Sequence, residues 1–309
     1  MTHALTRRRF VAISAALPLA GAAFGATMPE TRWKGRALGA SASLRIAGLA
    51  PDESAPVVTA VEAELQRLER IFSLYREDSA LVRLNRTGKL IASPPELLEV
   101  LSLVDHIHDV TGGAFDPTVQ PLFAALAHAA DAGRSVSPEE MRAARTHVGW
   151  DKVEITPNAI RLPSGAALTL NGIAQGYITD RIASLLRHRG LTNILVNAGE
   201  IRALGSRPDG TDWQAGIADP SGALVSRLTL TDRALATSAP GGTRLGPSAT
   251  EHILDPGTGT AARGAALVSV SAPTAMVADG LSTALCVIPP KGRAAVIAAF
   301  PQARIEASL

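Results

Sequence analysis

Apolar residues recur every three or four positions in the first half of the chain, and this spacing predicts helices with one buried face. Between residues 57 and 75 the spacing is that of an amphipathic helix, with Val58, Val61, Leu65, Leu68, Phe72 and Tyr75 on its apolar side. Two further helices are predicted at 93–112 and 137–149, because each segment starts with serine, proline and glutamate and ends at glycine. Such a start caps the first backbone N–H groups of a helix.

Short apolar runs bounded by turn residues predict strands. They lie at 153–156, 159–162, 167–170, 193–197, 213–218, 224–230 and 265–271. The first two flank Pro157-Asn158 as a hairpin, and the third leads through Asn171-Gly172 into a helix that ends at Arg189. A last helix is expected from 274 to 286. Because helices and strands are mixed without regular alternation, the pattern favours an α+β fold with mainly antiparallel sheets, packed helices and a single domain at 27–309.

The amino-terminal segment has the layout of an export signal. Arg7, Arg8 and Arg9 precede an uncharged apolar run that ends at Phe24 among small residues, which is the order of a cleaved signal. Arginine pairs followed by a residue and phenylalanine are typical of the twin-arginine type. The run is shorter than the roughly 20 residues that span a bilayer, although an amino-terminal anchor is the alternative. We therefore predict a signal peptide at 1–26 and a mature protein in the periplasm.

Composition narrows the function classes. The chain has 309 residues, of which 46% are apolar and 19% charged, and such a chain folds rather than remaining disordered. Without residues 1–26, which contain three arginines and no acidic residue, the net charge of +2 becomes −1, so no nucleic-acid partner is expected. The single cysteine, Cys286, excludes a disulfide framework and a multi-thiolate metal site.

Four stretches are richer in glycine and polar residues than packing requires, at 112–119, at 170–177, at 237–240 with 252–259, and at 278–283. Paired glycines in the first allow a close approach of the backbone to a ligand. The second opens a helix, whose N–H groups attract phosphates. The third places a histidine before a turn. Each has a structural alternative: a helix stop, ordinary packing or a structural histidine.

The fourth stretch contains a pair of side chains suited to a metal. Asp279 and Thr283 are four residues apart on the predicted helix, so their oxygens project from one face. A carboxylate and a hydroxyl suit a hard cation such as Mg²⁺, with further oxygens from carbonyls, water or substrate. The alternative is a threonine that bonds its own helix backbone.

Together and in this order, the four stretches resemble the ApbE-type FAD:protein FMN transferases. The matching phrases are G-G-x-F-D-P-T-V, N-G-I-A-Q-G-Y, H-I-x-D-P-x-T-G and A-P-T-A-x-x-A-D-x-x-x-T, with F-S-x-Y beginning at Phe72. The resemblance runs from residue 34 to residue 290. The export signal and the phrase L-N-G-I-A-Q-G-Y are similar to the NosX branch, which serves nitrous oxide respiration.

The resemblance implies a reaction and roles for particular residues. Members of this family split FAD, attach its FMN half to a threonine of another exported protein and release AMP. A Mg²⁺ site is implied at the backbone carbonyl of Gly172 and the side chains of Asp279 and Thr283. His252 is implied as the base, because imidazole titrates at about pH 6.5. FAD contacts are implied for Leu38, Tyr75, Ala114, Phe115, Asp116, Thr169, Gln175 and Ile253.

The chain departs from the family's pattern near the second stretch. Thr169 stands where many relatives have aspartate, Asn171 replaces a glycine, Gln175 replaces a charged residue, and Leu38 stands where methionine is common. Two alternatives therefore stay open: a carrier that holds FAD without cleaving it, and a Mg²⁺-dependent FAD pyrophosphatase. The chain lacks the acceptor pattern that this family modifies, [S/T]-G-[A/S]-[S/T]-x-[S/T], so a separate acceptor protein is expected. The resemblance to the NosX branch implies that this acceptor is a membrane-bound flavoprotein.

Overall fold

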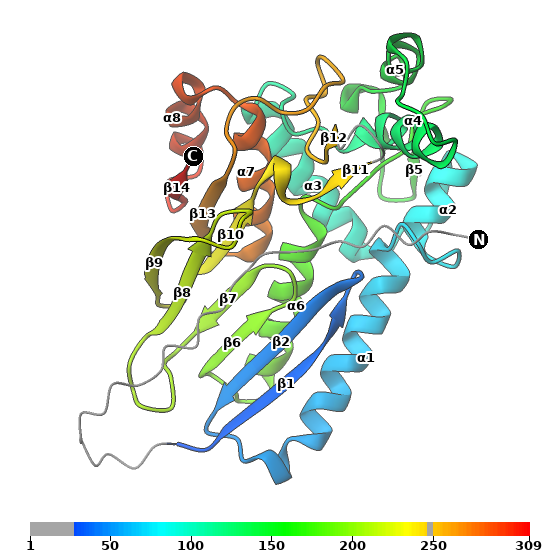
Figure 1. Cartoon of the computed structure of the whole chain (residues 1–309). Coiled ribbons are helices and arrows are strands. Elements are labelled where there is room, and N and C mark those ends of the chain that lie inside the picture. The colour runs from blue at the N-terminus through cyan, green and yellow to red at the C-terminus, as the bar shows by residue number, and fades with distance from the viewer. Residues whose placement is uncertain (1–27, 246–249) are drawn as a thin grey trace.

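The computed structural model describes residues 28–245 and 250–309, so the signal predicted at 1–26 lies outside the described residues. A seven-stranded sheet forms the centre of the fold, and every neighbouring pair of its strands is antiparallel. In sheet order the strands are β1 (Glu30–Ala37), β2 (Ala40–Ala47), β6 (Ile194–Asn197), β7 (Ile201–Leu204), β10 (Ala234–Ser238), β13 (Val268–Ala272) and β14 (Arg304–Ser308). The predicted α+β class with antiparallel sheets is confirmed (Figure 1).

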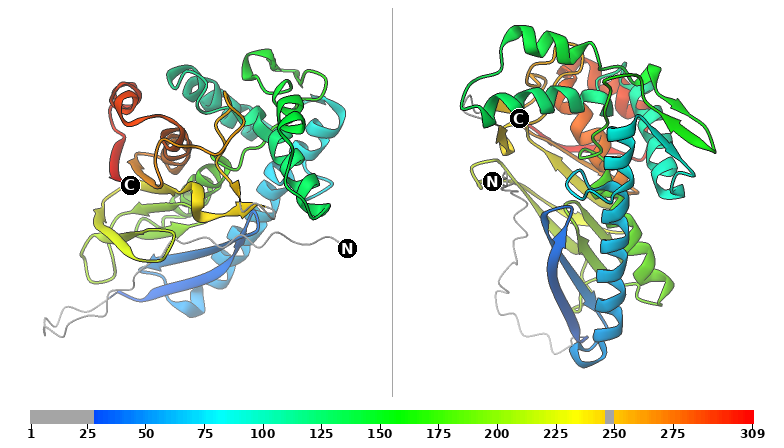
Figure 2. Two further views of the ribbon diagram at one scale, coloured as in Figure 1. Left: turned by 45° about the horizontal axis from the view of Figure 1, so that its top comes forward. Right: turned by 90° about the vertical axis from the view of Figure 1, so that its right-hand side faces the viewer.

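The two faces of the central sheet are covered differently. Helices α1 (Ala55–Phe72), α6 (Ala174–His188) and α7 (Ala275–Val287) pack on one face (Figure 2). A hairpin of β8 (Trp213–Ala218) and β9 (Leu224–Leu230) lies against the other. Strand β6 shows why both faces are apolar. Its Ile194 and Val196 join the core under the helices, while Leu195 joins the core under the hairpin, because successive strand residues point to opposite faces.

Four further helices gather at one end of the molecule, around a three-stranded sheet (Figure 1). They are α2 (Ala80–Thr87), α3 (Pro95–Val110), α4 (Gln120–Asp131) and α5 (Pro138–Arg145), and the sheet contains β3 (Lys89–Ile91), β5 (Ala159–Arg161) and β4 (Glu154–Ile155). The hairpin predicted around Pro157-Asn158 is confirmed as β4 and β5. The short strands β11 (Arg244–Leu245) and β12 (Thr250–Glu251) and helix α8 (Pro290–Ala298) complete the fold. No helix in residues 28–245 or 250–309 is long and apolar enough to cross a membrane.

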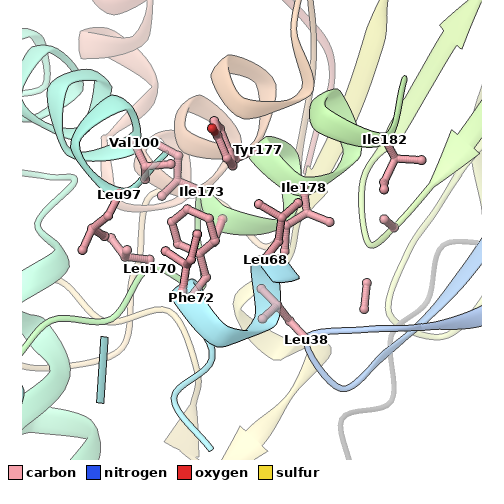
Figure 3. Packing of buried hydrophobic residues seen from close by; sticks show 14 of the residues in the cluster. Leu38, Leu68, Phe72, Leu97, Val100, Leu170, Ile173, Tyr177, Ile178 and Ile182 are labelled. Carbon is pink, nitrogen blue, oxygen red and sulfur yellow. The ribbon is translucent and has the colours of Figure 1, made fainter. Parts of the chain in front are cut away.

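The largest hydrophobic core lies where α1 and α6 pack together (Figure 3). The predicted apolar stripe of α1 contributes Leu68 and Phe72, both almost fully buried. The Phe72 ring meets that of Tyr177 edge to face, with ring centres 5.4 Å apart, which is a favourable geometry for two aromatic rings. Tyr177 also donates its hydroxyl to Glu99 Oε2 at 2.8 Å. This core fixes α6, the helix that follows the Asn171-Gly172 turn.

Three predicted helix ends are wrong, and at two of them, the ends of α1 and α5, a side chain bonds the backbone locally. Helix α1 ends at Phe72 rather than at residue 75, since Ser73 is extended and its Oγ accepts the N–H of Tyr75. Helix α3 is preceded by Pro94, with no side-chain cap from the serine at position 93. Helix α5 has the predicted capping box at its start but ends at Arg145, where the Thr146 hydroxyl closes the last turn. Such local bonds compete with the helix ladder.

The strand predicted at 167–170 is also wrong. The segment is not paired with any strand in the described part of the chain. The side-chain amide of Asn85 takes the place of a strand partner, because it donates to Leu168 O and accepts from Leu168 N, both at 2.8 Å. Thr169 N donates to Pro117 O at 2.8 Å. Buried backbone groups need partners, and here a side chain of α2 and a loop carbonyl supply them.

Candidate active site

The second and fourth sequence stretches meet where α6 crosses α7. A Cβ atom on Gly172 would lie 2.9 Å from Thr283 Oγ1, and one on Gly176 would lie 2.3 Å from the carbonyl oxygen of Ala275. Only residues without a side chain permit such close approaches. The turn before α6 therefore lies directly beside the face of α7 that carries Asp279 and Thr283.

Hydrogen bonds orient both polar side chains of α7. Asp279 is 3% exposed, and its Oδ2 accepts the N–H of Gly176 at 3.0 Å. Thr283 Oγ1 lies 3.2 Å from Ser238 Oγ at the end of β10, and that serine also lies 2.8 Å from Ser282 Oγ. The described residues contain no group of three or more His, Cys, Asp or Glu side chains that could hold a metal. The implied set differs in kind, since it combines one carboxylate, one hydroxyl and one carbonyl.

His252 is held next to this crossing by backbone carbonyls. Its ring Nδ1 lies 3.0 Å from Pro240 O and 3.3 Å from Thr243 O, and its main-chain N–H also donates to Pro240 O. Two carbonyls facing Nδ1 favour the tautomer with the proton on that atom, which makes Nε2 the basic nitrogen of the neutral ring. Pro240 is two residues after Ser238, so the histidine and Thr283 are tied to the same short segment.

The first and third stretches meet at a cavity of about 590 Å³. Its walls include Gly112, Gly113, Ala114, Asp116, Asp255, Pro256 and Gly257, together with Gly149, Trp150 and Asp151. Among the described residues that line it, Gly172, Asp279 and Thr283 are absent. The candidate metal ligands thus do not line the cavity that the first and third stretches share.

Asp116 uses both carboxylate oxygens inside the protein. Oδ1 accepts the N–H of Thr118 at 2.7 Å and its hydroxyl at 2.5 Å, and Oδ2 accepts the N–H of Trp150 at 3.2 Å. The residue is 9% exposed. These bonds tie the loop after α3 to the turn at Trp150. The structure therefore gives Asp116 a scaffolding role, and its contact with FAD stays a prediction.

The other candidate FAD residues fall into two groups. Leu38 and Tyr75 lie near the carboxyl end of α1: Leu38 N donates to Glu69 Oε1 of that helix, and Tyr75 follows the helix with 68% of its surface exposed. Phe115, Thr169, Gln175 and Ile253 are buried, and Ala114 packs with Ile253 in the core under α7. The fold does not gather all of these residues into one cavity.

Gln175 has the strongest sign of a ligand. It is 2% exposed, yet among the described residues its Nε2 has no hydrogen-bond partner. Leaving a buried amide donor without a partner costs about 1 to 3 kcal/mol. Gln175 is three residues after Gly172, in the first turn of α6.

The sequence has a family match over most of its length. A model of the ApbE family matches residues 38–308. This chain belongs to the ApbE family.

Relatives and solved structures agree with this placement of the chain. It is 30% identical to the FAD:protein FMN transferase of Haemophilus influenzae over 74% of this chain and 71% of that protein, and 30% identical to that of Vibrio cholerae over 76% and 74%. The structure resembles the flavin transferase ApbE from Vibrio cholerae with a TM-score of 0.78 at 27% identity, covering 90% of this chain and 93% of the other. It resembles the ApbE protein from Thermotoga maritima with a TM-score of 0.79 at 28% identity, covering 89% and 93%.

Reasoning from the sequence missed Ser238, a polar residue beside the candidate metal ligands. Ser238 lies inside the third stretch, but nothing in its spacing shows that its hydroxyl meets Thr283 from 45 residues away. The α+β fold of the ApbE family brings the two together, because β10 and α7 are neighbours. A glycine- or serine-rich stretch at the end of a strand is the only signal that the sequence contains.

Proposed function

We propose that this chain is a Mg²⁺-dependent FAD:protein FMN transferase, which moves FMN from FAD to a threonine of a separate acceptor protein and releases AMP. The observation that carries the proposal is the approach of the Gly172 turn to Asp279 and Thr283 at the crossing of α6 and α7. The names of the curated relatives, FAD:protein FMN transferases, support the same activity.

The residues at the crossing fit a magnesium ion. The Gly172 carbonyl and the side chains of Asp279 and Thr283 are the oxygen ligands that a hard cation prefers. When bound there, the metal neutralises the diphosphate of FAD. The protein prepares the site by fixing the Asp279 carboxylate through the N–H of Gly176.

His252 is suited to proton transfer. In the proposed step its Nε2 takes the proton from the acceptor threonine, whose oxygen forms a bond to the phosphorus of the FMN half. The bond between that phosphorus and the oxygen of AMP breaks, and AMP leaves with the electron pair. The proton on His252 then passes to water or to the leaving phosphate. The carbonyl of Pro240, 3.0 Å from Nδ1, stabilises the imidazolium between these events.

Replacing His252 tests this role. We expect His252→Ala to reduce FMN transfer by about 10²- to 10⁴-fold, the usual contribution of a general base, while FAD binding is retained. Quenching of flavin fluorescence measures the binding, and the mass of an acceptor peptide measures the transfer. Loss of FAD binding in this variant would make His252 a flavin contact rather than a base.

The first experiment incubates the mature protein with FAD, with Mg²⁺ or EDTA, and with or without a peptide that carries the acceptor pattern. A peptide that gains one FMN only when metal is present supports the transferase. AMP together with free FMN, and an unchanged peptide, would instead indicate the pyrophosphatase. Bound FAD without any AMP would indicate a carrier that holds FAD without cleaving it. The replacement of the relatives' aspartate by Thr169 would then account for the missing cleavage.

We also propose that residues 1–26 direct export by the twin-arginine route, so that the enzyme acts in the periplasm on a membrane-bound respiratory flavoprotein. The similarity to the NosX branch suggests nitrous oxide respiration as the setting. Fractionation of cells that express the whole chain tests the location, and replacing Arg7, Arg8 and Arg9 by lysine should retain the protein in the cytoplasm. Export of that variant would contradict the twin-arginine assignment.

A further inference from the structure

Helix α7 receives its amino-terminal cap from α6. The Asp180 carboxylate accepts two backbone N–H groups, that of Ala275 at Oδ1 and that of Met276 at Oδ2, both at 2.9 Å. Ala275 and Met276 are the first two residues of α7. The first N–H groups of a helix have no partners within it and carry partial positive charge. A carboxylate that binds two of them therefore fixes this helix end strongly.

The opposite contact is made one turn earlier in α6 and one turn later in α7. Asp279 of α7 accepts the N–H of Gly176, which is in the first turn of α6. Gly176 and Asp180 are four residues apart, and so are Ala275 and Asp279, so each helix offers an N–H group and a carboxylate on one face. We call these four residues together with Met276 the reciprocal clamp. In it, each helix start is bound by a carboxylate of the other helix.

The surroundings keep Asp180 charged in spite of its burial. Arg202 of β7 places Nε 3.9 Å from Asp180 Oδ1, and 14% and 20% of the two side chains are exposed. Desolvation raises the pKa of Asp180 to about 6, and the nearby Glu99 adds to this rise. The two backbone N–H groups and Arg202 lower the pKa and so limit the rise. At pH 7.5 the side chain is thus a carboxylate that accepts both N–H groups.

We propose that Asp180 is a positioning residue for the metal site, which holds α7 in the register that brings Asp279 and Thr283 to the carbonyl of Gly172. This inference rests on the proposed function. Thr274 already caps α7 from its own segment through the N–H of Val277, so Asp180 is not needed merely to start the helix.

The geometry of a helix shows why register matters here. A shift of one residue moves a helix by about 1.5 Å along its axis and turns its side chains by about 100°. Such a shift would remove both Asp279 and Thr283 from the Gly172 turn. Asp180 prevents it by joining the start of α7 to α6, the helix that begins directly after that turn.

The test is metal binding by the folded protein, with Mn²⁺ as the probe, measured by electron paramagnetic resonance without FAD. We expect Asp180→Asn to weaken Mn²⁺ binding by about 10- to 100-fold, as changes of residues that orient metal ligands do. Asp180→Glu keeps the charge and should restore part of the affinity.

The matched control is Asp219→Asn, because Asp219 also accepts two backbone N–H groups, those of Ser221 and Ala223, but in an exposed turn. Its affinity should equal that of the wild type.

Kinetics give a second readout. In Asp180→Asn the Mg²⁺ concentration for half-maximal AMP release should rise by the same factor, whereas kcat at saturating Mg²⁺ should stay within about twofold, since an intact site forms once metal is bound. A general loss of folded protein would lower kcat and leave the Mg²⁺ dependence unchanged. That result would overturn the positioning role.

The outcomes separate this inference from the proposed function. A wild-type protein that binds no Mn²⁺ would contradict the metal site itself. Wild-type binding together with equal binding by Asp180→Asn would contradict only the role of Asp180. If Asp180→Asn does not fold, hydrogen exchange of the wild-type protein tests the role of Asp180 instead. Mn²⁺ should then slow the exchange of the N–H groups of Ala275 and Met276, because metal binding and the reciprocal clamp stabilise each other. Unchanged exchange there would refute the inference.

Discussion

Two regions of this protein each contain a buried aspartate, and they use it in opposite ways. In the loop after α3, Asp116 bonds Thr118 and Trp150 and so holds its own surroundings together. At the crossing of α6 and α7, Asp279 bonds Gly176, 103 residues away, beside the turn of Gly172. The two carboxylates are similarly buried, at 9% and 3% exposure. Burial alone therefore does not distinguish the two regions; the crossing differs because oxygen atoms from distant elements converge there.

The glycines of the two regions differ in the same way. Gly112 has φ +58°, and no described residue beyond its two chain neighbours has an atom within 4 Å of where its Cβ would be. A glycine is favoured there because the turn needs a left-handed backbone conformation. Gly176 has ordinary helical surroundings, but a Cβ there would collide with the carbonyl of Ala275. One glycine permits a backbone conformation and the other permits a close approach of two helices.

The largest effect is expected at Asp279. Replacing it by alanine should abolish Mg²⁺-dependent AMP release, because the only carboxylate of the implied metal site is lost. Chromatography of AMP measures the activity, and thermal melting shows whether the variant is folded. Turnover retained by folded Asp279→Ala would contradict the assignment of the metal site.

Asp116 should behave in the opposite manner. Replacing it by alanine leaves the N–H groups of Thr118 and Trp150 without their acceptor, at about 1 to 3 kcal/mol for each buried group. We expect the free energy of unfolding to fall by about 4 kcal/mol, as measured by urea denaturation. FAD titration of the variant under native conditions then tests the predicted flavin contact. A stability equal to that of the wild type would contradict the scaffolding role.

A pair of glycine variants sharpens the contrast. Gly176→Ala pushes α6 and α7 apart and should cost about 3 kcal/mol of stability, together with a loss of Mn²⁺ affinity. Gly112→Ala only strains a left-handed backbone in open space, at about 1 kcal/mol, and should keep the affinity. Denaturation and metal titration of both variants provide the comparison. Equal losses of Mn²⁺ affinity in the two variants would show that metal binding does not depend on the close contact of α6 and α7.

Much of the fold was predictable from periodic patterns, and what failed has physical reasons. The apolar stripe of α1 and the hairpin of β4 and β5 follow from local spacing and turn residues. Strand β2 was missed because only Leu44 and Ile46 of its buried face are large, while the third core residue is the small Ala42, so its alternating pattern is weak. The segment 167–170 was misassigned because its partner is the side chain of Asn85, 83 residues away from Leu168.

The candidate site was predictable only in part. The spacing of Asp279 and Thr283 indicates a shared face on one helix, but their approach to Gly172 was implied by the family resemblance alone. Ser238 and Asp180 were missed, since the first meets Thr283 across 45 residues and the second meets Ala275 across 95. Contacts of that range depend on the packing of α6, α7 and β10, which no local pattern shows. The roles of His252 and of the flavin residues stay predictions.

The smallest expected effect concerns the pH dependence of Asp180. Its pKa is raised to about 6 in the folded protein, above the unfolded value of about 3.9. Between these values the folded state keeps a proton that the unfolded state releases, so the contribution of Asp180 to stability falls as pH rises from about 4 to about 6 and is constant above.

Asp180→Asn lacks this titration. The free energy of unfolding of the wild type, relative to the variant, should therefore decrease by about 2 to 3 kcal/mol across that pH window, as measured by urea denaturation at several pH values. The change depends on Arg202 and Glu99, the charged groups next to Asp180, so both must be kept in the two proteins.

Asp219→Asn, in the exposed turn, should follow the wild type. A wild type that gains stability over Asp180→Asn as pH rises would show that the two N–H groups and Arg202 outweigh desolvation. The carboxylate would then stabilise the contact between α6 and α7. The raised pKa of Asp180 indicates the reverse: above pH 6 the charged side chain lowers the stability of the folded protein. The protein keeps this charge in spite of that cost, which fits a residue that positions a binding site.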